Sequence, residues 1–253
     1  MTSLAPTMSV ELLPAMPQFA AGDDVAGAIA EAARRSGVGI GPEDVVVVAQ
    51  KIVSKAEGRA VDLATVEADP QALELAALTG REPALARLVL DEAQSVMRAT
   101  PQAIITRHRT GHVTANSGID ASNVEGGKVL LWPLDPDGSA RAIRDGLPGR
   151  PAVIIADSLG RAWRQGTLGT AIGCAGLVHT DDRRGQTDMF GRTLQATVVA
   201  IADAIAAFAV LAMGEGAEGT PVAIVRGAAR WITEDHGEGA AAIMRPVAGD
   251  MFP

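Results

Sequence analysis

The sequence predicts an α+β fold in which helices pack against a mixed sheet. Short apolar runs typical of buried strands alternate with helical segments, but not in the strict order of a doubly wound sheet. Hydrophobic residues make up 47% of the 253-residue chain, whereas aromatic residues make up only 3% and Tyr is absent. Ala and Val must therefore fill most of the core, which favours helices and strands that approach one another closely.

Glycine, proline and acidic cap residues separate the apolar segments in the first half of the chain. Asp23 and Asp24 suit the N-terminus of a first helix, and Pro83 suits the first position of a third. A Thr110-Gly111 turn joins two alternating segments typical of a β-hairpin. The predicted elements are an irregular or extended N-terminal segment (1–17), a helix (25–35), a turn (37–42), a strand (45–49), two short helices (69–79 and 83–93) and two hairpin strands (103–107 and 112–115).

A glycine-rich segment is the most unusual feature of the second half. Residues 166–176 hold four glycines in eleven positions, which predicts close backbone approach or tight packing and excludes a helix. No repeat or flexible linker is visible, so we expect a single domain over residues 1–253. The other predicted elements are a strand (129–132), a turn and cap (135–139), a helix (140–145), a strand (152–156), the longest helix (194–213), a strand (222–225) and a short final helix (237–244).

Composition and charge exclude several classes of protein. The net charge of −8 argues against a general nucleic-acid binder, which needs a basic surface. The first eleven residues carry no Lys or Arg, unlike a secretory signal. Asp203 interrupts the longest apolar run, residues 196–213, which predicts a buried helix and no membrane span. The single cysteine, Cys174, predicts a cytoplasmic, reducing compartment and a small core residue.

The segment VVVVAQKIVSKAEGR, residues 45–59, is the most informative single stretch. A buried strand is followed at once by a dense polar group: Gln50, Lys51, Ser54, Lys55, Glu57 and Arg59. Ammonium and guanidinium groups neutralise phosphates and donate several hydrogen bonds, so this group suits a polyanionic ligand. A solvated surface face explains the segment alone equally well.

Two acidic residues are the best candidates for metal ligands. Asp157 directly follows the predicted strand 152–156, at a strand end where sites commonly form, and Ser158 adds a hydroxyl oxygen. Asp120 lies in a Gly-Ile-Asp-Ala-Ser-Asn turn. Hard oxygen ligands hold Mg²⁺ or Mn²⁺, although a helix cap or an Asx-turn explains each residue locally. The residues alone thus predict a phosphate- and metal-binding pocket, and no P-loop or G-x-G-x-x-G motif identifies a nucleotide.

Five segments, in order, resemble the coenzyme F420-0:L-glutamate ligase family. They read KIVSKAEGR, GIDASNV, DPDGSARAIRD, DSLGRAWR and MGEGAEGTPVAIVRG, and the resemblance runs from about Glu11 to the C-terminus. It implies an F420-0 gamma-glutamyl ligase-like fold, L-glutamate and the deazaflavin precursor F420-0 as substrates, and GTP as the energy source. It also implies an intertwined homodimer with the site near the subunit interface, and a ligase domain without the C-terminal nitroreductase-like domain of some members.

The resemblance implies metal ligands and catalytic residues. The metal ligands correspond to Asp120, Asp157, Ser158 and Glu215, where Ser158 replaces the usual Thr and the residue type at Glu215 is variable. Two Mg²⁺ or Mn²⁺ ions are implied, and a monovalent cation such as K⁺ is a further candidate. Lys55, Asp120 and Asp157 are the implied catalytic residues, with Lys55 stabilising the transferring phosphoryl group.

The resemblance also implies a nucleotide-binding set and a substrate-binding set. Met16 departs from the family's Leu, and the contacts of its segment are mostly through backbone. Arg161 and Arg164 suit carboxylates and Trp163 suits a flat ring, although a surface ion-pair cluster with a half-buried Trp explains them too. The nucleotide-binding set is Met16, Pro17, Gln18, Phe19, Gln50, Lys55, Asn123, Met213, Gly214, Glu215, Gly216, Ala217, Glu218, Gly219 and Thr220.

The implied reaction has two steps. A carboxylate of F420-0 attacks the γ-phosphate of GTP to give an acyl phosphate, and the glutamate α-amine then displaces phosphate; further rounds add glutamate through the γ-carboxylate.

Two alternatives to this function stay open. One is a paralogous GTP-dependent amide ligase for a different acid or amine, with the change placed at residues 16–19 and 166–170. The other is a non-enzymatic nucleotide-binding protein, against which the acidic set and Lys55 argue.

Overall fold

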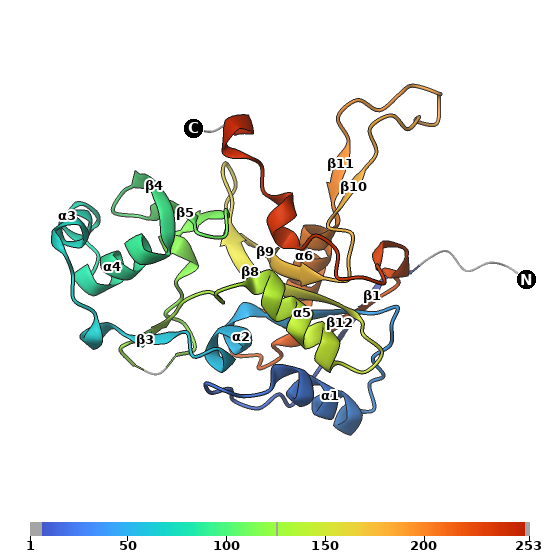
Figure 1. Ribbon diagram of the computed structural model, residues 1–253, viewed down its shortest axis with the longest axis horizontal. Coiled ribbons are helices and arrows are strands. Elements are labelled where there is room, and N and C mark those ends of the chain that lie inside the picture. The colour runs from blue at the N-terminus through green and yellow to red at the C-terminus, as the bar shows by residue number, and fades with distance from the viewer. Residues whose placement is uncertain (1–6, 125, 251–253) are drawn as a thin grey trace, which may run out of the picture.

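A five-stranded mixed sheet forms the centre of the fold in the computed structural model, which describes residues 7–124 and 126–250 (Figure 1). β2 and β8 are parallel, and every other neighbouring pair in this sheet is antiparallel. The predicted α+β class with a mixed sheet is therefore confirmed. In spatial order the strands are β1 (Ser9–Leu12), β12 (Val222–Arg226), β2 (Val45–Ala49), β8 (Ala152–Gly160) and β9 (Thr167–Ala175).

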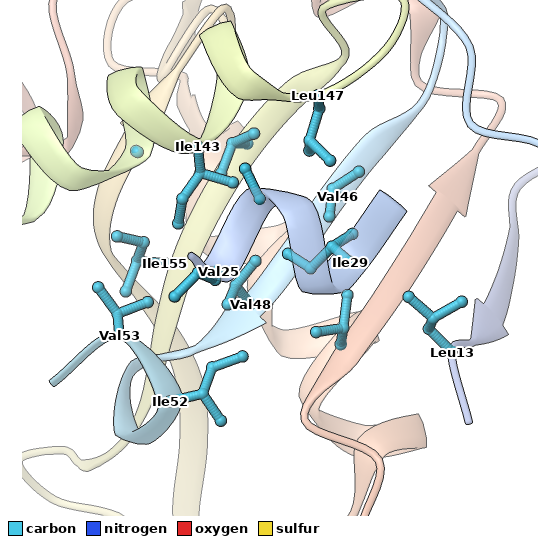
Figure 2. Close-up of a cluster of buried hydrophobic side chains, with 14 of the residues drawn as sticks. Leu13, Val25, Ile29, Val46, Val48, Ile52, Val53, Ile143, Leu147 and Ile155 are labelled. Carbon is cyan, nitrogen blue, oxygen red and sulfur yellow. The ribbon is translucent and has the colours of Figure 1, made fainter. Parts of the chain in front are cut away.

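Helices bury both faces of this sheet. α1 (Val25–Ser36) and α5 (Pro136–Gly146) cover one face, and α6 (Ile201–Met213) covers the other. Figure 2 shows the first face, where Val46 and Val48 of β2 meet Ile29 of α1 and Ile143 of α5. Val45 and Val47 point to the opposite face and pack in the cluster of α6. Burial on both faces explains why β2 is a continuous apolar run without alternation.

Local signals set the ends of α1 as predicted. The Asp24 side chain accepts a hydrogen bond from the Gly27 amide at 3.0 Å, and Gly37 ends the helix in the left-handed region at φ 70°. The polar segment after β2 is itself a short helix, α2 (Gln50–Ala56), which the sequence analysis does not predict. α2 buries Ile52 and Val53 and turns Lys51 and Lys55 to the same side, because residues four apart share a helix face.

A smaller lobe, between β2 and β8 in sequence, lies on the side of Figure 1 where α3 and α4 are labelled. The two predicted helices and the predicted hairpin are confirmed, whereas β3 and β4 are not predicted. The lobe has its own apolar cluster, which includes Ala76, Val89 and Ile104. Its elements are β3 (Ala60–Asp62), α3 (Pro70–Thr79), α4 (Pro83–Glu92), β4 (Ala93–Ala99), β5 (Ile104–His108), β6 (Val113–Ala115) and β7 (Lys128–Leu130).

The strand that carries Asp157 is longer than predicted. β8 continues through Gly160 because β9 pairs with it antiparallel as far as Thr167, so Asp157 lies inside a strand and not after its end. The glycine-rich segment is β9, and the predicted tight packing is confirmed. A Cβ atom at Gly169 would lie 2.7 Å from the Ala206 carbonyl oxygen of α6.

The predictions of two helices near the C-terminus are only partly correct. The helix predicted over 194–213 begins at Ile201, because Val198–Ala200 forms a strand, β11, that pairs with β10 (Thr180–Asp182). Val198 and Val199 are β-branched, which favours strand over helix. Figure 1 shows these strands leading into a hairpin that projects from the body. The final helix predicted over 237–244 is a single 3₁₀ turn, Ala240–Ile243.

Two further predictions concern the interior and the membrane. Cys174 is 1% exposed, and burial raises the pKa of its thiol to about 12, so it is a core residue as predicted. Among the helices of residues 7–124 and 126–250, none combines the length and the apolar character needed to cross a bilayer.

Candidate active site

A cavity of about 380 Å³ opens where β2 and β8 run side by side to the same edge of the sheet. The parallel pairing of Ala49 with Ala156 brings Gln50 and Asp157 to this edge together. All fifteen residues of the predicted nucleotide-binding set line this cavity: Met16, Pro17, Gln18, Phe19, Gln50, Lys55, Asn123, Met213, Gly214, Glu215, Gly216, Ala217, Glu218, Gly219 and Thr220. The set is drawn from four separate stretches of chain, and its role in binding stays a prediction.

Gln50 gives the cavity wall a buried donor. Its side chain is 1% exposed, and its Oε1 accepts a hydrogen bond from Ser54 Oγ at 2.7 Å. Its Nε2 has no hydrogen-bond partner among the residues that the structure describes. A buried amide donor left unpaired costs free energy, which an acceptor on a bound ligand would recover.

Two lysines of α2 reach toward the Asp120 turn. Lys55 Nζ donates to the Asn123 carbonyl oxygen at 3.0 Å, and Lys51 Nζ forms an ion pair with the Asp120 carboxylate. Burial alone would raise the pKa of Asp120, but the hydrogen bonds from Lys51 and Ser122 outweigh it and lower that pKa. The sequence places Lys51 in the polar group that suits a polyanionic ligand, and its spacing of four from Lys55 places both lysines on one helix face.

Asp157 is held by two donors at the bottom of the site. Its Oδ2 accepts from Trp132 Nε1 and its Oδ1 from the Ser158 amide, both at 2.8 Å. Burial and the nearby Asp120 charge raise the pKa of Asp157, and these donors together with Lys51 counteract the rise only in part. A carboxylate that resists ionisation in a polar cavity is a candidate for contact with a cation. No local sequence pattern predicts the hydrogen bond between Trp132 and Asp157.

The implied metal ligands form pairs and not one cluster. Ser158 Oγ donates to Glu215 Oε1 at 2.5 Å, and Asp120 lies close enough to Asp157 to act on its charge. Within residues 7–124 and 126–250, no three His, Cys, Asp or Glu side chains are gathered so as to hold a metal ion. The donors are nevertheless hard oxygens, and Mg²⁺ in proteins is commonly held by one or two carboxylates plus substrate phosphates. The residues therefore fit a divalent cation that a phosphate ligand completes.

The loop after α6 closes the far side of the cavity. Gly214 and Gly219 have φ of 82° and 70°, a region that disfavours other residues. Glu218 Oε2 accepts from the Gly216 amide at 2.7 Å, and Thr220 Oγ1 donates to the Met213 carbonyl oxygen at 2.9 Å. These bonds fold the loop onto itself and direct its backbone to the cavity.

The three residues predicted to bind substrate do not line this cavity. Arg161, Trp163 and Arg164 lie in the exposed turn between β8 and β9, and Trp163 is 87% exposed. Arg161 Nη1 donates only weakly to the Gly166 carbonyl oxygen, at 3.5 Å. Their substrate contacts stay a prediction, and the half-burial expected for Trp163 as part of a surface cluster is wrong.

Buried histidines flank Trp132 and make the fold sensitive to acid. Burial lowers the pKa of His112 from 6.5 to about 4, because the cation is poorly solvated there. The unfolded chain then binds more protons between these values. We expect the free energy of unfolding to fall by about 3 kcal/mol on this account as the pH drops from 7 to below 4.

Urea unfolding at several pH values checks this expectation. His112→Gln should remove that part of the pH dependence, whereas His236→Gln, at a partly exposed position, should leave it in place. An unchanged slope in His112→Gln would contradict the assignment.

Comparison with known proteins identifies the family to which the chain belongs. Residues 15–227 match the sequence model of the family described as F420-0:Gamma-glutamyl ligase. The protein named coenzyme F420:L-glutamate ligase from Methanothermobacter thermautotrophicus is 41% identical over 241 residues, which span 94% of this chain and 95% of the relative. The protein of the same name from Methanopyrus kandleri is 41% identical over 252 residues, or 98% of both chains. The family resemblance is confirmed, and the chain belongs to the F420-0:gamma-glutamyl ligase family.

Proposed function

We propose that this chain is a GTP- and divalent-metal-dependent ligase that attaches L-glutamate to coenzyme F420-0. The observation that carries the proposal is that one cavity gathers the whole predicted nucleotide-binding set beside Asp157 and Ser158. Family membership supports the same reaction, because the relatives carry the name coenzyme F420:L-glutamate ligase.

The chemistry of the cavity wall supports a nucleoside triphosphate. Lys51 and Lys55 bring two positive charges to it, and Gln50 offers an unpaired amide donor. The glycine-containing loop 213–220 brings backbone amides within reach of a flat or anionic ligand. These features suit a polyphosphate and a base, and the choice of GTP rests on the family resemblance.

The acidic residues support a divalent cation. Asp120 and Asp157 come from different lobes, and Ser158 and Glu215 add two further oxygens. When bound there, Mg²⁺ or Mn²⁺ would offset charge on the phosphates and on the group under attack. Lys51 would then exchange its ion pair with Asp120 for a phosphate oxygen, which keeps the charge balanced as the ligand enters.

The proposed reaction divides amide formation into two displacements. A carboxylate oxygen of F420-0 attacks the γ-phosphorus of GTP, the bond to the bridging oxygen breaks, and GDP leaves. The glutamate α-amine, as the free base, then attacks the acyl carbon, and phosphate departs with the original carboxylate oxygen. Lys55 would stabilise the transferring phosphoryl group, and further rounds through the γ-carboxylate would extend the chain.

An isotope experiment tests this function and its intermediate together. F420-0 labelled with heavy oxygen in its tail carboxylate is incubated with the protein, GTP, Mn²⁺ and L-glutamate, and the phosphate is analysed by mass spectrometry. We expect one heavy oxygen in the phosphate released with the first glutamyl addition, and unlabelled phosphate from later additions through the unlabelled γ-carboxylate. Singly glutamylated product with unlabelled phosphate would refute the acyl phosphate, and no product would refute the ligase.

A homodimer is part of the proposal. The projecting β10–β11 hairpin carries Met189 and Phe190, which are 98% and 95% exposed. Two large apolar side chains exposed together are typical of a contact surface. Sedimentation equilibrium should give twice the chain mass of 25.9 kDa, and a monomer at micromolar concentration would contradict the dimer.

A further inference from the structure

Trp132 contacts one acidic residue of the candidate site, Asp157, and the turn that carries the other, Asp120. Its side chain is fully buried, and its Nε1 donates to Asp157 Oδ2 at 2.8 Å. The same indole edge lies against Gly118, two residues before Asp120. A Cβ atom at Gly118 would lie 2.4 Å from Trp132 Cε2 and 2.6 Å from its Nε1. One side chain therefore touches both the strand that carries Asp157 and the turn that carries Asp120.

The Asp120 turn is fixed against the smaller lobe. Asn116, Ser117 and Gly118 all have φ between 51° and 69°, a run that is costly for residues other than glycine. Ser117 is buried, and its Oγ donates to the Val89 carbonyl oxygen at 2.8 Å. The turn thus holds a strained shape, and that shape places Gly118 on the indole edge.

Trp132 is itself fixed on its other sides. Its ring packs against His108 and His112, with ring centroids at 4.8 and 5.4 Å, and its carbonyl oxygen accepts from Arg59 Nε at 2.8 Å. Arg59 in turn pairs with Glu92 at 2.8 Å. Burial opposes the charge of Glu92, but its bonds to His108, Arg59 and Arg109 prevail and lower its pKa to about 2. The Arg59 bond therefore holds the Trp132 backbone, and a rotation of the indole would break its bond to Asp157 and its packing against both histidines.

We propose that Trp132 is a positioning residue that holds Asp157 and the Asp120 turn in register for a divalent cation. The indole N–H of Trp132 occupies one lone pair of Asp157 Oδ2 and fixes the plane of the carboxylate. The remaining lone pairs of Asp157 therefore keep a fixed orientation toward a bound cation. A donor behind a metal ligand commonly changes metal affinity ten- to a hundredfold. The inference rests on the proposed function, because it assigns Asp120 and Asp157 to that cation.

A double-mutant cycle on Mn²⁺ binding tests the proposal. Trp132→Phe keeps a buried ring but removes the donor and the indole edge that lies against Gly118, and Asp157→Asn removes the charge that the donor orients. We expect Trp132→Phe to weaken Mn²⁺ binding about tenfold by calorimetry, and to have a smaller effect once Asp157 is Asn. Trp231→Phe, which removes an indole packed near α6, is the matched control and should bind Mn²⁺ as the wild type does.

The outcomes separate this inference from the proposed function. Equal weakening by Trp132→Phe in both backgrounds, or wild-type affinity in Trp132→Phe, would overturn the positioning role while leaving the metal site intact. A wild-type protein that binds no Mn²⁺ would overturn the metal site and the inference together.

A second measurement needs no variant of Trp132. NMR of the isotope-labelled indole nitrogens follows Trp132 Nε1–H in the wild type. Its resonance should shift in Asp157→Asn and broaden on addition of Mn²⁺, whereas that of Trp231 should keep its position in Asp157→Asn and broaden less. An unaffected Trp132 resonance in Mn²⁺-bound protein would place the ion elsewhere and contradict the proposal.

Discussion

Replacing Asp157 with Asn is expected to abolish glutamyl transfer, lowering turnover about a thousandfold. The substitution removes one unit of negative charge from the cavity where the proposed cation and the triphosphate must be held together. Asn keeps one oxygen that can accept from Trp132 Nε1, and it loses the bond from the Ser158 amide. The initial rate of GDP release with F420-0 and L-glutamate measures the effect.

The stability of the same variant separates a catalytic defect from misfolding. Burial raises the pKa of Asp157, which means that the folded protein holds this charge at a cost. Asp157→Asn should therefore unfold at a temperature close to that of the wild type, because removal of this charge offsets the bond lost to the Ser158 amide. Asp145→Asn, on an exposed position of α5, is the matched control and should keep full turnover. Full turnover in Asp157→Asn would remove the main support for the ligase.

Gly173→Ala is expected to destabilise the protein by about 3 kcal/mol or more. A Cβ atom there would lie 2.4 Å from the carbonyl carbon and oxygen of Pro136, the first residue of α5. A backbone neighbour cannot turn aside as a flexible side chain can. α5 is also held in place by Asp137, whose carboxylate accepts from the amides of Cys174 and Ala240. Urea unfolding gives the change in free energy.

Gly160→Ala is the control for this substitution. Gly160 lies on β8, next to β9, and a Cβ atom there would meet, apart from its two chain neighbours, no atom of the described residues within 4 Å. Its replacement should change the free energy of unfolding by no more than about 0.5 kcal/mol. A mild effect at Gly173, equal to that at Gly160, would show that α5 can move away from β9 at little cost.

The fold was predictable where local signals agree with tertiary structure. The continuous apolar runs of β2 and β8 and the Asp24 cap of α1 identify those elements without any knowledge of their neighbours. β11 was not predictable, because its apolar residues run on into α6 and only pairing with β10 makes them a strand. The extension of β8 past Ala156 likewise depends on its partner β9.

The candidate site likewise has residues that the sequence could predict and contacts that it could not. Motif residues such as Lys55 and Asn123 can be found in the sequence, and the structure places them on one cavity wall. The ion pair of Lys51 with Asp120 and the bond from Trp132 to Asp157 join residues of separate elements. Neither contact can be predicted from the spacing of these residues in the sequence. For Arg161 and Trp163 the sequence motif predicts a substrate-binding role, but the structure leaves both side chains exposed and outside the cavity.

The mass of the product is the most direct test of the proposed ligase. The purified protein is incubated with F420-0, L-glutamate, GTP and Mn²⁺, and the deazaflavin product is followed by mass spectrometry. We predict successive additions of a glutamyl unit with matching release of GDP, and the loss of both in Asp120→Ala. Binding of GTP and Mn²⁺ without any glutamyl addition would contradict the proposal and favour a ligase for a different acid or amine, or a nucleotide-binding protein without enzymatic activity.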